Sequence, residues 1–228
     1  MTEWLAYDLQ PLWLTFKLAA LTTLILCVIG IPFAYWMAHT KVRFKPVLEA
    51  LVSMPLVLPP SVLGFYLLLL FNPQGGFGHF VESFIGIKLA FSFAGLVVAS
   101  VIFSFPFLVH PVQSGFQSLP DSLSEAAYTL GKSRWQTFVR VLMPNIKPSL
   151  LAGIVLSFAH TIGEFGVVLM IGGNLPGETK VAAIAIYDEV ESLNYAAANF
   201  YALVLFSVCF IILLSVYLLN RKMLMKVG

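Results

Sequence analysis

Residues 12–37 read LWLTFKLAALTTLILCVIGIPFAYWM, a run in which Lys17 is the single charged side chain. About 20 mainly apolar residues are enough for a helix to cross the hydrocarbon core of a bilayer. Further apolar runs occupy residues 47–71, 89–109, 149–171 and 196–219. None alternates in polarity as a barrel strand would, so each must satisfy its backbone hydrogen bonds as a helix. The sequence predicts an all-α polytopic protein, with five transmembrane helices forming a single domain over residues 1–228.

The composition excludes several classes of protein. Hydrophobic residues make up 59% of the chain and charged residues 11%, with a mean hydropathy of +0.91. A water-soluble domain of this size could not bury so many apolar side chains, so we expect a lipid bilayer as the solvent. The net charge of +2 is too small for a nucleic-acid-binding surface. Cys27 and Cys209 lie in apolar runs without neighbouring ligands, so neither a disulfide nor a metal site is expected.

The basic residues are distributed unequally between the two sides of the predicted bundle. Ten lie in segments 38–46, 110–148 and after residue 219, whereas the other side has only Lys17, Lys88 and Lys180. Cytoplasmic connections carry the excess of lysine and arginine. The sequence therefore predicts an inner-membrane protein with its N-terminus outside and its C-terminus in the cytoplasm. The ten residues are Lys41, Arg43, Lys45, Lys132, Arg134, Arg140, Lys147, Arg221, Lys222 and Lys226.

The connection 119–148 has the pattern of a helical hairpin. Ser122 and Glu125 have capping-box spacing after Pro120, which predicts that a short helix begins there. Gly131 can adopt the left-handed conformation that ends such a helix. Ser133 and Gln136 repeat the capping spacing and predict a second helix.

The second predicted helix has an apolar face. Trp135, Phe138, Val139 and Leu142 recur at helical intervals, and we expect them to lie together on that face. Proline ends a helix because it lacks a backbone N–H and its ring clashes with the preceding turn. We therefore expect the second helix to end at Pro144 and Pro148.

The hairpin resembles the cytoplasmic EAA loop of ABC importer permeases. That loop has the pattern E-A-A, three residues, G, nine residues, I, one residue, L-P, and this chain matches it at Glu125, Ala126, Ala127, Gly131 and Pro144. Val141 and Met143 replace the isoleucine and leucine with apolar side chains of similar volume. The resemblance implies a type I ABC importer permease fold, in which the short helix couples to a separate ATPase. The alternative is a surface hairpin in which Glu125 only caps its own helix.

The segment Gly131-Lys132-Ser133 resembles the end of a phosphate-binding P-loop. A complete P-loop needs a glycine five positions earlier, where this chain has Ala126, and a preceding strand rather than a capped helix. We therefore expect no ATP site and no enzymatic activity in this chain. The resemblance implies that ATP and Mg²⁺ bind to the partner ATPase.

The second apolar run is interrupted by Pro55, Pro59 and Pro60. These prolines free carbonyl groups that lipid cannot satisfy, so irregular backbone there must face protein or a water-filled path. We predict a broken helix over residues 55–64 facing the interior, with Ser61 on the path and Gly64 allowing close contact. The alternative is a simple proline kink in a packed helix.

The fourth apolar run carries Ser157, His160, Thr161 and Glu164 at spacings that place all four on one helix face. An ionisable group near the middle of a bilayer costs at least about 2.5 kcal/mol, so this face should point into the bundle. We interpret the face as part of a translocation path or gate. The alternative is that His160 and Glu164 only pair with each other.

Three segments narrow the resemblance to the molybdate permease subunits of these importers. They are Pro55–Pro60, Gly163-Glu164-Phe165-Gly166 and Asn174-Leu175-Pro176-Gly177-Glu178-Thr179. The likeness covers residues 12–220 and implies import of molybdate or tungstate. Sulfate permeases share an element similar to the second segment, so sulfate is the alternative cargo within the same superfamily.

The charge of molybdate restricts how the predicted path can work. A dianion would be repelled by Glu164, so we expect this residue to brace a helix interface or gate rather than to bind cargo. Pro59, Pro60, Ser61, Ser157 and Thr161 would line a weakly binding conduit. Because no fixed cation lies in the middle of a span, affinity is expected to reside in a periplasmic oxyanion-binding protein.

Five helices are too few to enclose a wide path, whereas a homodimer would offer two coupling hairpins to two ATPase subunits. The outer loops 72–88 and 172–195 would then dock the binding protein, unless they are only solvated connectors. Two other classes remain open: a proton-coupled secondary transporter using His160 and Glu164, and a membrane scaffold that transports nothing.

Overall fold

A computed structural model describes residues 7–224, and every regular element in this range is a helix. Lys226, which contributed to the charge count, lies outside the described residues. The elements are α1 (Gln10–His39), α2 (Lys45–Val57), α3 (Pro60–Phe71), α4 (Gly76–Ile85), α5 (Phe93–Gln117), α6 (Ser122–Thr129), α7 (Arg134–Thr137), the π-helix η2 (Phe138–Leu142), α8 (Met143–Asn145), α9 (Lys147–Gly163), α10 (Gly166–Gly172), α11 (Ala182–Glu191) and α12 (Tyr195–Leu224).

Three single helices are long and apolar enough to cross a membrane, namely α1, α5 and α12. Two further candidate spans are bent pairs: α2 with α3, at 113°, and the segment Arg134–Asn145 with α9, at 80°. Five is the largest number of crossings that these candidates allow, with each bent pair counted as one. The second pair includes Arg134–Asn145, which lies in the hairpin that was predicted to be cytoplasmic. The all-α fold class is confirmed.

The break between α2 and α3 lies where the proline pair predicts it. Leu58 and Pro59 each precede a proline and have extended backbone, with ψ angles of 137° and 136°. A following proline disfavours the α conformation, so the helix stops at Val57 and restarts at Pro60. Pro55 is tolerated inside α2. The predicted break is therefore confirmed, whereas its position facing the interior stays a prediction.

Helix α5 differs from its prediction at both ends, because it begins at Phe93 and continues to Gln117 rather than stopping near residue 109. At its start, the Ser92 hydroxyl accepts a hydrogen bond from the Gly95 N–H over 3.1 Å. Its last turns are buried against the rest of the bundle through Leu108, Val112 and Phe116. This tertiary packing extends the helix past Pro111.

The fourth predicted span is interrupted. Helix α9 ends at Gly163, Glu164 has extended backbone, and the separate helix α10 begins at Gly166. A Cβ atom added at Gly166 would lie 2.7 Å from the Cβ of Pro60. Residues 149–171 were predicted to form one continuous helix, and this prediction is wrong. The break lies where α10 approaches α3 closely.

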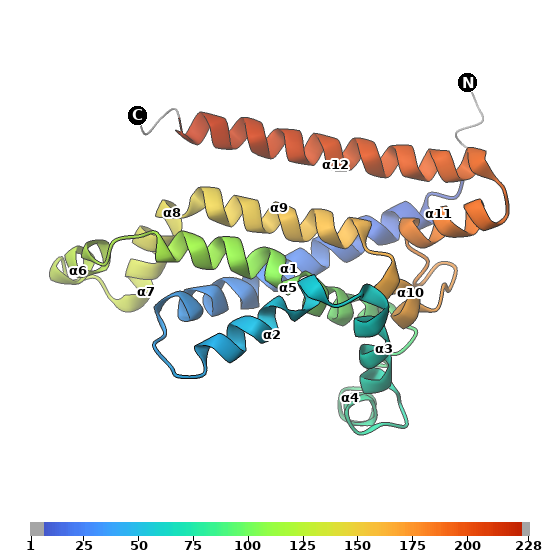
Figure 1. The fold of residues 1–228 in the computed structure, drawn as a ribbon, viewed down its shortest axis with the longest axis horizontal. Coiled ribbons are helices and arrows are strands. Elements are labelled where there is room, and N and C mark those ends of the chain that lie inside the picture. Colours follow the sequence, from blue (N-terminus) through green and yellow to red (C-terminus); the bar gives the residue numbers. More distant parts are fainter. Residues whose placement is uncertain (1–6, 225–228) are drawn as a thin grey trace.

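Most connections between the long helices lie at two opposite ends of the bundle, whereas α4 lies below α3 and apart from α11 in the view of Figure 1. Helices α6, α7 and α8 lie at one end, together with the end of α1 and the start of α2, whereas α11 lies at the other end. The loops 72–88 and 172–195, which were predicted to lie on the outer side, contain helices α4 and α11. Ala182, Ile184 and Ala185 of α11 are fully buried or nearly so, which shows that this loop is more than a solvated connector.

Candidate functional site

Helices α5 and α9 are joined by hydrogen bonds between polar side chains inside the bundle. The Ser104 hydroxyl lies 3.0 Å from His160 Nδ1 and 2.9 Å from the Thr161 hydroxyl. Thr161 also donates to the Ser157 carbonyl oxygen over 2.9 Å. Ser157 and Thr161 are 0% and 2% exposed. The structure therefore places these two predicted path residues in a helix contact.

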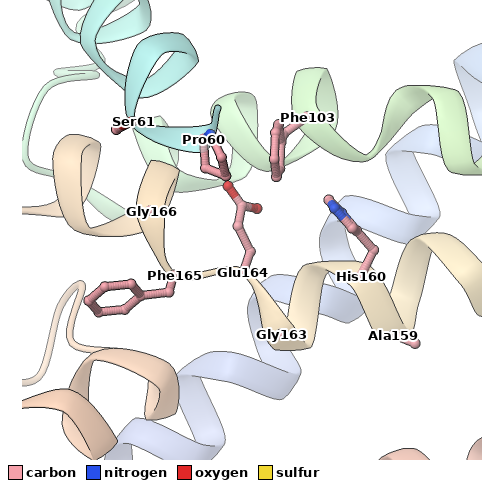
Figure 2. A pocket seen from close by; sticks show the side chains of 9 residues that line it. All are labelled: Pro60, Ser61, Phe103, Ala159, His160, Gly163, Glu164, Phe165 and Gly166. Atoms are coloured by element: carbon pink, nitrogen blue, oxygen red, sulfur yellow. The ribbon is translucent and has the colours of Figure 1, made fainter. Parts of the chain in front are cut away.

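A cavity of about 610 Å³ lies beside this contact, between α3, α5 and the break after α9 (Figure 2). Of the predicted path residues, it includes Pro60, Ser61 and Glu164, together with His160. Phe103 also forms part of the wall, and its place inside an apolar run gave no sequence signal for this role. The complete lining is Pro60, Ser61, Phe103, Ala159, His160, Gly163, Glu164, Phe165 and Gly166.

The Glu164 carboxyl group points from the break toward Pro60 and Phe103 (Figure 2). Its side chain is buried, and the Ser100 hydroxyl donates to Oε2 over 3.3 Å. Its other oxygen, Oε1, is buried without a hydrogen-bond partner in the described part of the chain. A buried acceptor of this kind is costly unless something else satisfies it. Glu164 is thus a polar group available to whatever occupies the cavity or rearranges around it.

His160 and Glu164 have separate partners rather than each other. His160 bonds to Ser104 and stacks on Phe107, with 3.9 Å between ring centroids, whereas Glu164 bonds to Ser100. Ser100 and Ser104 are four residues apart within an apolar run. That spacing places them on one helix face, and it was the sequence signal that could have identified both partners.

The hairpin begins differently from its prediction. Asp121 takes the N-cap position of α6, without a side-chain capping bond, and the Glu125 N–H donates to the Asp121 carbonyl oxygen over 3.1 Å. Ser122 is therefore the first residue of the helix, and the predicted capping box of Ser122 and Glu125 is wrong. Because Glu125 does not cap its own helix, its exposed carboxylate is free for another contact.

The two alanines of the motif have different surroundings. Ala126 is exposed, whereas Ala127 is 5% exposed and its carbonyl oxygen accepts from the Lys132 N–H over 3.0 Å. Ala127 thus packs within the hairpin, and Ala126 lies on its outer surface. The helix ends as predicted, because Gly131 has a φ of +75° and its N–H donates to the Tyr128 carbonyl oxygen.

The second half of the hairpin confirms one prediction and corrects another. Ser133 and Gln136 form both hydrogen bonds of a capping box. The helix then widens into the π-helix η2 and continues through Pro144 to Asn145. Pro144 has no N–H to donate to the Arg140 carbonyl oxygen, as an α-helix would require. The wider turn of the π-helix just before it accommodates part of this missing hydrogen bond. Pro144 therefore does not end the helix as predicted.

The hairpin is attached to the bundle by aromatic and aliphatic side chains. The Phe138 ring lies 4.9 Å from Tyr35 of α1 and 5.9 Å from Phe116 of α5, measured between centroids. Leu142 is 2% exposed and packs in the same cluster. Of the predicted apolar face, Trp135 and Val139 are instead exposed, at 70% and 43%. The part of the second hairpin helix that packs against the bundle is thus narrower than the apolar face that the residue spacing predicted.

Comparison with known proteins relates this geometry to transport systems. A family model described as "Binding-protein-dependent transport system inner membrane component" matches residues 30–225. The molybdenum transport system permease protein ModB of Azotobacter vinelandii is 47% identical over 94% of this chain and 95% of that protein. ModB of Escherichia coli is 34% identical over 80% of each chain. The E. coli sulfate transport system permease protein CysT is 34% identical, over 86% of this chain and 70% of its own length.

Solved structures show the same fold at lower identity. A chain of a bacterial alginate ABC transporter, in complex with its alginate-bound periplasmic protein, aligns over 94% of this chain and 78% of its own, with a TM-score of 0.74 and 18% identity. A chain of the MetNI methionine ABC transporter aligns over 97% of this chain and 99% of its own, with a TM-score of 0.72 and 18% identity. The chain therefore belongs to the family of inner membrane components of binding-protein-dependent transport systems, and it has the fold of type I ABC importer permeases.

Proposed function

We propose that this chain is the permease subunit of an ATP-driven importer of molybdate or tungstate. The observation that carries the proposal is its 47% identity, over 94% of its length, to a molybdenum transport system permease. The three segments at residues 55–60, 163–166 and 174–179 support the same cargo. In this proposal the N-terminus lies outside, and the basic connections and the C-terminus lie in the cytoplasm.

Helix α6 is the proposed contact for a separate ATPase, which binds ATP and Mg²⁺. Support comes from the position of α6 at one extremity of the bundle (Figure 1) and from the exposure of Glu125 and Ala126. The Phe138 and Leu142 contacts with α1 and α5 would transmit a movement of α6 to the spans. A tightly packed attachment of this kind moves as a unit rather than deforming continuously.

Two copies of the chain are proposed to form the path, each bound to one of two ATPase subunits. Support comes from the apolar surface of α2, α3 and α4, where Val57, Tyr66 and Phe84 are 83%, 63% and 79% exposed. The cavity beside Glu164 borders α3 and would open toward the second copy. The path then consists of Pro59, Pro60 and Ser61 with Glu164 at its gate, and Ser157 and Thr161 set the position of α9.

The outer segments 72–88 and 172–195 are proposed to dock a periplasmic oxyanion-binding protein. Support comes from side-chain contacts that fix the conformation of the second segment. Lys180 and Asp188 form an ion pair at 2.6 Å, and the Asn174 amide donates to the same carboxylate. A docking surface held in one conformation loses less entropy on binding than a flexible loop.

Reconstitution with the ATPase and the binding protein in proteoliposomes tests this function. We expect ATP-driven molybdate uptake that tungstate inhibits and that continues when the proton gradient is collapsed. Glu125→Lys and Gly131→Val should each abolish uptake, because the first reverses the charge offered to the ATPase and the second strains a left-handed residue. Glu82→Lys, an exposed charge reversal on α4, should leave binding of the ATPase unchanged. Uptake driven by a proton gradient without ATP, or inhibited by sulfate alone, would refute the proposal.

A further inference from the structure

A second cavity, of about 580 Å³, lies between the hairpin and the last turns of α1. Pro32 and Tyr35 come from α1, and Tyr128 comes from the end of α6. The remaining wall is formed by the start of the second hairpin helix and by η2. Its lining is Pro32, Tyr35, Tyr128, Arg134, Trp135 and Phe138.

The cavity combines one cation with aromatic walls. The side chains of Tyr35, Tyr128 and Arg134 all line this cavity, so two phenol groups and one guanidinium border the same space. The lining contains no aspartate or glutamate. Among the residues whose side chains the structure describes, the one ion pair joins Lys180 and Asp188, so Arg134 has no carboxylate partner. The cavity is therefore complementary to an anion, with two phenol hydroxyls available as further donors.

An exposed apolar surface continues from this cavity along α1. Leu24, Val28 and Trp36 are 62%, 67% and 45% exposed, and Pro32 is exposed between them. Side chains at this spacing share one helix face. Tyrosine and tryptophan are typical of the boundary between lipid headgroups and acyl chains, and arginine side chains near helix ends extend to the same boundary. The anion-complementary cavity thus lies at the end of a surface suited to hydrocarbon chains.

We propose that this cavity binds the headgroup of an anionic phospholipid, whose acyl chains lie along the exposed face of α1. The Arg134 guanidinium holds the phosphate, and the aromatic rings of Tyr35, Trp135 and Phe138 enclose the glycerol region. The lipid thereby links the hairpin to α1. This inference rests on the proposed function for its side of the membrane, because the cytoplasmic leaflet supplies the anionic lipid there.

Native mass spectrometry of the complex of permease and ATPase tests the site. The complex is titrated with phosphatidylglycerol or phosphatidylcholine in detergent, and the lipid retained per permease copy is counted. We expect phosphatidylglycerol to bind the wild type and Arg134→Gln to weaken its binding about tenfold, the effect of losing one charge-assisted contact. Arg140→Gln is the matched control, because Arg140 is another exposed arginine of the same hairpin that lies outside the cavity.

Three results would overturn the inference. Equal retention of the two lipids would show that the site does not select an anion. Displacement of phosphatidylglycerol by equimolar glycerol 3-phosphate would show a site for a free phosphate rather than for a lipid. Loss of the ATPase from Arg134→Gln with unchanged lipid retention would assign Arg134 to the ATPase contact.

Molybdate uptake by the wild-type complex, measured in parallel, separates the two proposals. If the complex transports molybdate with ATP but retains no phosphatidylglycerol, the lipid site fails and the proposed function stands. If phosphatidylglycerol binds through Arg134 but no ATP-driven uptake occurs, the proposed function fails and the lipid site stands.

Discussion

Glu164 poses the main question at the scale of single residues, because a buried carboxyl group borders a path proposed for a dianion. Its contact with Ser100 satisfies one oxygen and leaves Oε1 without a partner. An ionised carboxylate within the membrane costs at least about 2.5 kcal/mol and would repel the cargo. A neutral carboxyl group, bonded to Ser100 and free to rearrange when the gate opens, avoids both costs.

Replacement of Glu164 by glutamine distinguishes a neutral gate residue from a proton carrier. We expect Glu164→Gln to retain most ATP-driven molybdate uptake, because the amide keeps the shape and can accept from Ser100. Glu164→Ala should lose uptake, since it enlarges the cavity and leaves the buried Ser100 hydroxyl unpaired. Initial uptake rates in proteoliposomes measure both. Complete loss of uptake in Glu164→Gln would instead indicate that a titrating proton is needed.

Ser104 holds α5 against α9 through two partners. Ser104→Ala removes the hydroxyl that contacts both His160 and Thr161. We expect the free energy of unfolding to fall by about 1–3 kcal/mol, because two hydrogen bonds worth about 0.5–1.5 kcal/mol each are lost. Thermal unfolding of the detergent-solubilised protein measures the change. Ser114→Ala, at an exposed position of the same helix, is the control; an equal effect at both positions would contradict the role given to Ser104.

Predictions from sequence were confirmed where the backbone preference of one residue determines the end of a helix. They were wrong where hydrogen bonds to neighbouring residues determine it. Gly131 ends α6 in the left-handed region as predicted, because glycine lacks the Cβ that penalises this conformation. The start of α6 was misplaced by one residue. The Pro120 carbonyl accepts from the Leu123 N–H and begins the turn earlier, so Asp121 takes the cap position expected for Ser122.

At the scale of elements, the sequence located the apolar helices and the break at Pro59 and Pro60. It did not locate the break after Gly163, because no proline marks it and the contact of Gly166 with Pro60 is tertiary. The extension of α5 was missed for a similar reason. A Cβ added at Gly115 would lie 2.7 Å from the Cβ of Ser149, which shows how closely α5 and α9 pack there.

The attachment of the hairpin to the bundle should depend on Leu142. Leu142→Ala would leave a cavity between η2 and α5, and we expect a loss of about 2–5 kcal/mol in stability. Coupling should weaken as well, so ATP would be hydrolysed with less molybdate transported per ATP. Leu130→Ala is the control, because Leu130 is 78% exposed on the same hairpin. A ratio of transport to hydrolysis unchanged in Leu142→Ala would contradict the proposed transmission.

The two ends of the whole molecule are proposed to bind different partners. The hairpin occupies one end and α11 the other (Figure 1). The arrangement agrees with the two groups of connections that the charge count distinguished in the sequence. Partners could not be deduced from apolar periodicity alone, because hydropathy determines where a chain meets lipid and carries no information on what binds its connections.

Cross-linking from Ala126 tests most directly whether α6 contacts the ATPase. Cys27 and Cys209 are first replaced by serine, and a cysteine is introduced by Ala126→Cys or, at the opposite end, by Ala196→Cys; both alanines are exposed. The reconstituted complex is treated with a short photoactivatable thiol reagent. Our prediction is that Ala126→Cys yields a covalent adduct with the ATPase and that Ala196→Cys yields none. An ATPase adduct from Ala196→Cys, or an adduct of Ala126→Cys with the periplasmic binding protein, would contradict it.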